Sequence, residues 1–390
     1  MALELLFLLL PVAALSGWLL GRRTGSSRQD RSHSLLSADY FKGLDFLLNE
    51  QPDKAIEVFI HMLEVDSETV ETHFAIASLF RKRGEVDRAI RIHQNLIARP
   101  ALKQRQREQA LYELSVDYQR AGLLDRAEKL LQELLHENSD YRKRALMQLL
   151  NIYQQEKDWG KAINTGKHLQ RLGEDAINPI VAHFFCEQAE QALLLHEHDA
   201  AIQLARRALQ EDRRCVRASL IEGRTELAKG EWKSAVHALQ QVEKQDPDFL
   251  PEALPLLREA HAQQGRTQEL MAYLHGLLAR HKGTSIRLTL AELIELQEGR
   301  AAASDFLSAE LRQRPSLRGM ARLMRYRQDA SAGAAHDEWQ ILLELMDGLL
   351  EEKPVYACSE CGYSGKLLSW QCPSCKQWNT IKPIAGVEGE

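Results

Sequence analysis

Three patterns of apolar and polar positions follow one another along the 390-residue chain. From Ala2 to Leu20 almost every position is apolar, and Glu4 and Ser16 are the polar exceptions. The long middle of the chain is rich in helix-forming residues, and its apolar and small positions recur at the length of a helical hairpin. Strand signals are nearly absent until the last part of the chain. The pattern predicts an all-α fold with a small, different domain at its end.

The first apolar run has the length of a membrane-spanning helix. A helix of about 19 residues rises roughly 28 Å, close to the thickness of a hydrocarbon core. Arg22 and Arg23 follow at once and no Lys or Arg precedes the run, so the positive-inside rule places the rest of the chain in the cytoplasm. A cleaved signal peptide has the opposite arrangement, and a buried core helix is the other alternative. We expect a single-pass transmembrane anchor at 1–21 and a linker at 22–34.

The middle of the chain repeats itself. Phrases such as Asp53-Lys-Ala-Ile and Asp87-Arg-Ala-Ile return with spacings of 34, 38, 35, 39 and 34 residues between their small residues. Those small residues are Ala55, Ala89, Ala127, Ala162, Ala201 and Ala235. An aromatic residue lies about nine positions before each of the first four, at Phe46, Phe80, Tyr118 and Tyr153. A glycine lies five positions before three of them, at Gly84, Gly122 and Gly230.

This spacing resembles the tetratricopeptide repeat, a pair of antiparallel helices. The aromatic residue of the first helix packs against the second, and the small alanine lets the two helices approach closely. We expect eight or nine units across residues 35–330, within an array at 35–335. Such arrays stack into a superhelix whose concave face commonly binds a peptide or another protein.

Four of the six cysteines form two Cys-x-x-Cys pairs near the end of the chain, at Cys358, Cys361, Cys372 and Cys375. Two such pairs supply a tetrahedral shell of four thiolates, which accepts either zinc or iron. The forms Cys-x-x-Cys-Gly and Cys-Pro-x-Cys resemble rubredoxin. We expect a metal-binding domain at 354–390 whose small core depends on the metal ion for its folding. Tyr356, Trp370 and Trp378 are placed to shield the site.

The segment before this domain carries an apolar stripe at helical spacing. The stripe consists of Trp339, Leu342, Leu343, Met346, Leu349 and Leu350. We expect a docking helix at 336–353 that joins the metal-binding domain to the array, and Lys353-Pro354 ends this helix.

Composition and motifs narrow the function classes. The net charge of −5 is small for this length and indicates no nucleic-acid partner. The chain contains no phosphate-binding Gly-x-x-x-x-Gly-Lys loop and no Gly-x-Ser-x-Gly nucleophile elbow. We therefore expect a protein that is not an enzyme.

Several isolated residues of metal-binding type are better explained by packing. The stretch His196-Glu-His198-Asp199 falls between two repeat helices and predicts a solvated turn. Cys186 and Cys215 are expected as small buried residues of helices. For the histidines His61, His73 and His93 packing is the default.

The order of anchor, array and paired cysteines resembles the lipopolysaccharide assembly protein B family of Gram-negative bacteria over essentially the whole chain. The segments that carry the resemblance most specifically are 3–11 with 21–23, 83–93, 182–186, 370–375 and 381–383. The four cysteines show no departure from the family pattern.

The resemblance implies a single-pass adaptor of the bacterial inner membrane that restrains lipopolysaccharide synthesis. Its implied partners are a membrane-bound ATP-dependent zinc protease, the deacetylase that commits precursor to lipid A, and other inner-membrane lipopolysaccharide-assembly proteins. The adaptor would promote degradation of the deacetylase by the protease. Self-association of the chain stays open. The metal site implied for the family is rubredoxin-like and falls on Cys358, Cys361, Cys372 and Cys375.

Two alternatives of other classes stay open at this point. One is a general scaffold that assembles lipopolysaccharide-synthesis enzymes at the membrane without a part in proteolysis. The other is an electron carrier of the rubredoxin type, which requires iron that cycles between oxidation states. The structural role of the metal is the simpler interpretation, because nothing else in the chain indicates redox chemistry.

Overall fold

The computed structural model describes residues 38–49, 51, 54–55, 58, 70–100, 102–136, 139–329 and 334–390. The chain divides into two compact units, Met1–Gln148 and Leu149–Glu390. The predicted anchor at 1–21 and the predicted linker at 22–34 lie outside the described residues. Among the helices of the described part, none is long and apolar enough to cross a membrane.

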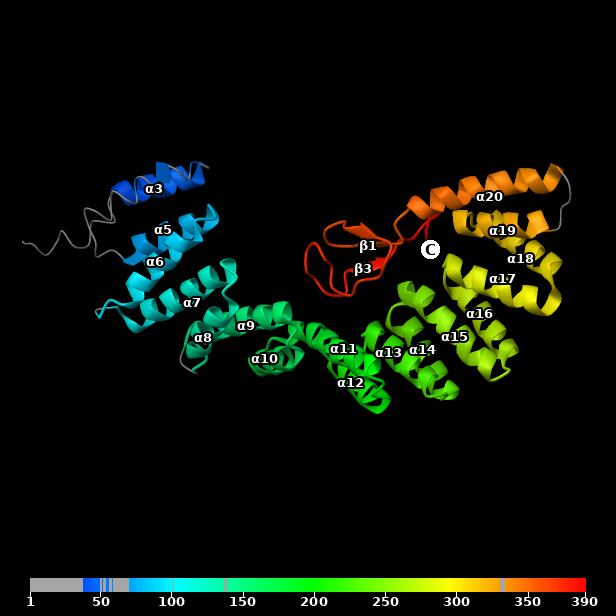
Figure 1. The fold of residues 1–390 in the computed structure, drawn as a ribbon, viewed down its shortest axis with the longest axis horizontal. Coiled ribbons are helices and arrows are strands. Elements are labelled where there is room, and N and C mark those ends of the chain that lie inside the picture. The colour runs from blue at the N-terminus through cyan, green and yellow to red at the C-terminus, as the bar shows by residue number, and fades with distance from the viewer. Residues whose placement is uncertain are drawn as a thin grey trace, which may run out of the picture. The chain divides into compact units, whose positions relative to one another are not determined.

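The described part of the first unit consists of helices. They are α3 (Ala38–Leu48), α5 (Val70–Lys82), α6 (Val86–Ile97), α7 (Gln104–Arg120), α8 (Leu124–Glu133) and the start of α9 (Arg142–Glu156). Helix α5 pairs with α6 and α7 pairs with α8, while α6 also packs on α7. The unit is therefore a run of stacked hairpins (Figure 1).

The second unit continues the hairpins and adds a small sheet. Its helices are α10 (Trp159–Arg171), α11 (Asn178–Leu194), α12 (His198–Glu211), α13 (Val216–Ala228), α14 (Trp232–Gln245), α15 (Leu250–Gln263), α16 (Thr267–Arg280), α17 (Thr284–Glu298), α18 (Arg300–Gln313), α19 (Leu317–Asp329) and α20 (Ala334–Glu352). Two short 3₁₀ turns, η1 (Asp175–Ile177) and η2 (Pro247–Phe249), precede α11 and α15. The predicted all-α repeat fold with a small terminal domain is confirmed for the described residues.

The repeated alanines lie where the sequence pattern requires them. Ala55, Ala89, Ala127, Ala162, Ala201 and Ala235 all have zero exposed surface. The aromatic residues Phe80, Tyr118 and Tyr153 are buried as well. A side chain larger than Ala at these positions would separate the two helices of a hairpin, so close packing explains the repeat.

The turns inside the hairpins share one backbone conformation. Gly84, Gly122 and Gly230 have φ values of 82°, 76° and 78°, in the left-handed region that favours glycine. Lys157 and His196 hold the same place, five positions before their alanine, with φ values of 56° and 61°. His196 therefore belongs to a turn, as the sequence predicts, and both side chains impose backbone strain that glycine avoids.

The sheet has three short antiparallel strands in the order β2-β1-β3. The strands are β1 (Tyr356–Cys358), β2 (Ser364–Gly365) and β3 (Ile381–Pro383). Tyr356 pairs with Gly365 on one side and with Pro383 on the other. We refer to residues 354–390 as the cysteine module. In Figure 1 the helices from α11 to α20 bend around this module.

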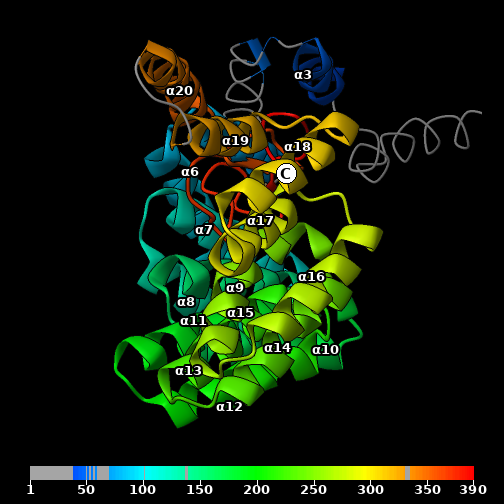
Figure 2. The ribbon, with the colours of Figure 1, turned by 90° about the vertical axis from the view of Figure 1, so that its right-hand side faces the viewer.

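Helix α20 packs along α19, and Figures 1 and 2 both show the two side by side. The predicted apolar stripe of α20 is divided between two environments. Leu343 is buried, whereas Leu342 and Leu349 are 45% and 55% exposed. The stripe is therefore not one docking face, and its buried part serves the hairpin with α19.

Candidate metal centre

The four predicted cysteines converge in the cysteine module. Their sulfur atoms all lie within 4.8 Å of one another. Cys358 Sγ is 3.8 Å from Cys375 Sγ, and Cys361 Sγ is 3.7 Å from Cys372 Sγ. No other group of three or more potential ligands of this kind occurs among the described residues.

The two Cys-x-x-Cys loops have matching backbone geometry. The amide of Gly362 donates to the carbonyl of Cys358 at 3.1 Å, and the amide of Lys376 donates to that of Cys372 at 2.9 Å. Gly362 and Lys376 both have positive φ, at 76° and 61°. Each loop turns tightly after its second cysteine, which brings the two thiols of that loop to one side.

The electrostatics of the four thiols favour a cation between them. A contact from the Thr380 hydroxyl, 3.3 Å from Cys358 Sγ, and nearby backbone amides lower the pKa of Cys358 to about 6. The Gln377 amide lowers the pKa of Cys375, but desolvation and the neighbouring sulfurs outweigh it and raise this pKa to about 11. Four thiolates this close repel one another unless a metal cation compensates their charge. The residues present therefore fit a four-thiolate metal site.

The module meets the repeat helices through two tryptophans. Trp378 stacks on His183 of α11 with ring centroids 5.1 Å apart, and it meets Phe184 edge to face at 5.9 Å. Its indole N–H donates to Oε1 of Gln154 in α9 at 2.8 Å. The ring of Trp378 is thus engaged with the repeat helices, a contact that the sequence did not predict.

Trp370 makes the second aromatic contact. Its ring stacks on Phe249 of η2 with centroids 5.3 Å apart, and the guanidinium of Arg217 in α13 lies 6.0 Å from the ring centroid. Arg217 is itself held by Glu190, with Nη2 to Oε2 at 2.8 Å, and by Glu187 at 2.9 Å. Trp370, like Trp378, faces the repeat helices. Of the three predicted aromatics, Tyr356 is the one that packs with the buried cysteines.

Burial controls the charge of His183 beneath these rings. Desolvation, with a smaller contribution from the positive charge of Arg217, lowers the pKa of His183 to about 3. The imidazole is therefore neutral at physiological pH and stacks as an aromatic ring. Its Nδ1 atom has no hydrogen-bond partner among the described residues.

Polar contacts surround the aromatic ones. Lys382 Nζ lies 2.8 Å from a carboxylate oxygen of Asp246 and 2.9 Å from one of Asp248. The Tyr356 hydroxyl donates to Glu252 of α15. The module thus contacts several successive hairpins, in each case at the first helix or at the residues just before it. These first helices form the face where a repeat array commonly binds its ligands.

The remaining candidates from the sequence do not join this site. Cys186 and Cys215 are buried with their sulfurs 3.7 Å apart, separate from the four-cysteine group. His93 is buried with Nδ1 2.5 Å from an oxygen of Asp117, so it belongs to a polar network in the repeats. His61 lies outside the described residues.

Sequence reasoning missed His183, Arg217 and Gln154 as contacts of the module. The one available signal was the presence of two tryptophans inside so small a metal-binding domain. A domain of this size cannot bury two indole rings by itself, so a surface elsewhere in the chain had to receive them.

Comparison with known proteins agrees with this architecture. Residues 356–383 match the family described as rubredoxin metal binding domain, and residues 72–108 and 192–260 match tetratricopeptide repeat families. Among solved structures, Naa15/Naa10 bound to HypK-THB superposes with a TM-score of 0.38 at 14% identity, over 78% of this chain and 52% of that chain. This structural match is too distant to support an inference.

Two curated relatives match along their whole length. Lipopolysaccharide assembly protein B of Escherichia coli strain K12 is 41% identical over 388 residues, which cover 99% of this chain and 100% of the relative. The protein of the same name from Haemophilus influenzae is 36% identical over 399 aligned positions, with 99% of both chains covered. Identity at this level over the full length is decisive, and the chain belongs to the lipopolysaccharide assembly protein B family.

Proposed function

We propose that this chain is an adaptor of the bacterial inner membrane and not an enzyme. Residues 1–21 anchor it, residues 22–34 form a linker, and the array at 35–335 lies in the cytoplasm. The adaptor promotes degradation of the lipid A-committing deacetylase by a membrane-bound ATP-dependent zinc protease. Anchoring supports this role, because it raises the effective concentration of the array toward other proteins in the same membrane.

In this proposal Cys358, Cys361, Cys372 and Cys375 hold one iron or zinc ion. The ion supplies folding energy to a module that is too small to fold by core packing alone. The convergence of the four sulfurs within 4.8 Å supports the assignment. The region 336–353 connects the array to the module at 354–390.

The observation that carries the proposal is the docking of Trp370 and Trp378 onto the repeat helices. This contact places the metal-held module on the face where repeat arrays commonly bind ligands. Folding of the module therefore determines how much of that face is open to a partner. A binding surface of this kind suits an adaptor, and its partners include the protease, the deacetylase and other inner-membrane assembly proteins. We expect no nucleic-acid partner, and copies of the chain can also associate.

Depletion of the chain in its native cell tests the proposal. The half-life of the deacetylase after translation is stopped should lengthen markedly, and re-expression of the wild-type chain should restore it. The variant Cys358→Ser/Cys361→Ser should fail to restore it, whereas Cys215→Ala, outside the metal centre, should succeed. An unchanged half-life on depletion would favour the general scaffold, particularly if synthesis enzymes still co-purify with the chain.

A further inference from the structure

A cavity of about 740 Å³ lies within the second unit, apart from the four cysteines. Helices α15, α17 and α19 form one wall, and the segment that runs from the end of α20 through the last residues forms the other. This volume is typical of a ligand site and would hold several residues of an extended peptide.

The helical wall of the cavity carries an excess of positive charge. Its charged residues are Glu252, Arg258, Glu292, Arg318, Arg322 and Arg325. Arg258 and Arg322 share the single carboxylate of Glu292 as their partner. Arg325 also pairs with Asp347 of α20 at 2.8 Å, so three carboxylates face the four guanidinium groups, and the remaining positive charge attracts an acidic ligand.

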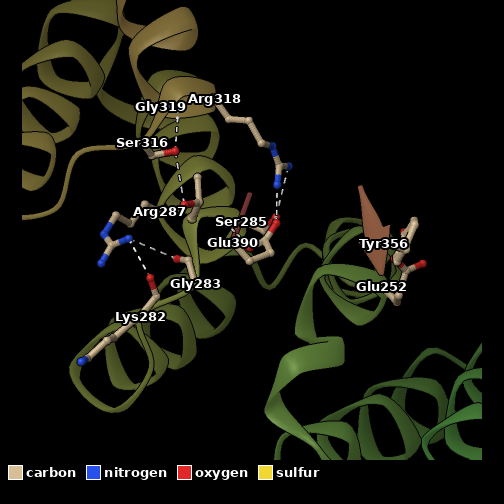
Figure 3. A network of polar contacts seen from close by, with 11 residues as sticks. Glu252, Lys282, Gly283, Ser285, Arg287, Ser316, Arg318, Gly319, Tyr356 and Glu390 are labelled. Atoms are coloured by element: carbon tan, nitrogen blue, oxygen red, sulfur yellow. Dashed lines mark hydrogen bonds and ion pairs between the residues drawn. The ribbon is translucent and has the colours of Figure 1, made fainter. Parts of the chain in front are cut away.

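One end of the cavity already holds a carboxylate of the chain itself. The side chain of Glu390 accepts hydrogen bonds from the backbone amide of Ser285 at 2.9 Å and from its hydroxyl at 2.5 Å. The guanidinium of Arg318 binds the same carboxylate. Figure 3 shows Glu390 between Ser285 and Arg318. These three donors, at the start of α17 and on α19, are of the kinds that proteins use to bind carboxylates.

The segment that carries Glu390 is held on the helices by few other contacts. The backbone amide of Leu317 donates to the carbonyl of Val387 at 2.8 Å, and Glu388 pairs with Lys353 at 3.0 Å. This pair is solvent-exposed, and exposed pairs contribute little to stability. Residues 385–390 can therefore be displaced without loss of the repeat core.

We propose that this cavity binds an extended acidic segment of a partner protein, in competition with the chain's own Glu390. The carboxylates of the partner replace Glu390 between Ser285 and Arg318 and continue along the arginines of the wall. While Glu390 occupies the site between Ser285 and Arg318, the partner cannot bind there. The apparent affinity for the partner is therefore reduced in proportion to the fraction of molecules in which this site is free. The inference does not depend on the proteolytic role proposed above, since it concerns only what this cavity binds.

Fluorescence anisotropy of labelled hexaglutamate, added to the full chain, tests the proposal. We expect Glu390→Gln to bind the probe about tenfold more tightly than the wild type, because its competitor is weakened. Addition of Arg318→Gln to this variant should reduce affinity at least tenfold. Arg280→Gln, which removes an exposed arginine outside the cavity, should leave it unchanged.

Three results would each overturn the proposal. They are equal affinity of the wild type and Glu390→Gln for the probe, an affinity that Arg318→Gln does not change, and binding of hexaglutamine as tight as that of hexaglutamate. Absence of binding to all variants would overturn it as well. Amide exchange separates displacement from a purely structural role of the segment. Saturating hexaglutamate should accelerate exchange at Gly386 and Glu390 of the wild type, whose amides donate to the carbonyls of Glu390 and Ile384. Unchanged exchange at these amides contradicts competition.

Discussion

Trp378 of the cysteine module and His183 of α11 stack with their ring centroids 5.1 Å apart and their planes inclined by 20°. The indole of Trp378 is fixed at its edge by a hydrogen bond to Gln154, which lies 224 positions earlier in the sequence. A neutral imidazole is what this stack requires, because a buried imidazolium would lack a compensating charge and would face Arg217. The contact therefore links the protonation of one histidine to the attachment of the module.

This stack makes the stability of the second unit depend on pH. The pKa of His183 is lowered from 6.5 to about 3, so the unfolded chain binds more protons between these values. The stabilisation is complete above about pH 6.5 and is lost progressively as the pH falls toward 3. Between pH 6.5 and 5 the loss should be about 2 kcal/mol.

Urea unfolding followed by tryptophan fluorescence measures this loss. His183→Phe keeps an aromatic ring for Trp378 but removes the titrating group, so its stability should vary less with pH over the same range. An identical pH dependence of the wild type and the variant contradicts the account.

The hydrogen bond between Trp378 and Gln154 should be measurable as a coupling energy. Trp378→Phe removes the indole N–H and Gln154→Ala removes its acceptor. In a double-mutant cycle on unfolding, the two changes should be non-additive by about 1 kcal/mol. Trp370→Phe is the matched control, because Trp370 has no contact with Gln154 among those that the structure records. Additive effects for the Trp378 pair would mean that the bond contributes nothing to docking.

Removal of the metal should release the module and leave the hairpins folded. A strong chelator should shift the emission of Trp370 and Trp378 to longer wavelength, since both rings lose their stacking partners. The far-UV circular dichroism should stay helical, because the helices are stabilised by their own packing. The variant Cys358→Ser/Cys361→Ser should behave as the chelated protein does without any chelator. Unchanged emission after verified metal loss would show that docking does not require the ion.

The turn positions give a paired test of backbone strain. Lys157→Gly should stabilise the chain by about 0.5–1 kcal/mol, because glycine adopts a positive φ without steric cost. Gly122→Ala should destabilise it by about 1 kcal/mol, and a Cβ there would meet no atom within 4 Å, so backbone strain is the whole effect. Thermal unfolding of both variants checks the signs. A destabilised Lys157→Gly would mean that the lysine side chain makes a contact that outweighs its strain.

The repeat and the metal-binding residues could be predicted because local spacing determines both. A small residue must recur where two helices of a hairpin touch, and Ala127 and Ala201 are fully buried for that reason. In the same way, two sulfurs of a Cys-x-x-Cys loop are brought together by the loop itself, as the Cys372 and Lys376 backbone contact shows.

The docking contacts could not be predicted, because they join residues far apart that share no pattern. Nothing near His183 in the sequence indicates that Trp378 will cover it. The stripe on α20 was misleading for a related reason. Periodicity shows that a helix has an apolar face, but it does not show how much of that face a neighbour covers, and Leu349 stays exposed. The turn at Lys157 was not predicted, because glycine is the residue from which such turns are recognised.

The most direct test of the account is the half-life of the lipid A-committing deacetylase in cells whose only copy of this chain carries Trp370→Ala and Trp378→Ala. Metal analysis of the purified variant should first confirm one bound ion per chain, so that the module is folded but lacks its aromatic contacts with the repeat helices. We predict a deacetylase half-life as long as that after depletion of the chain. A half-life equal to that with the wild-type chain would contradict the claim that docking of the module carries the adaptor function.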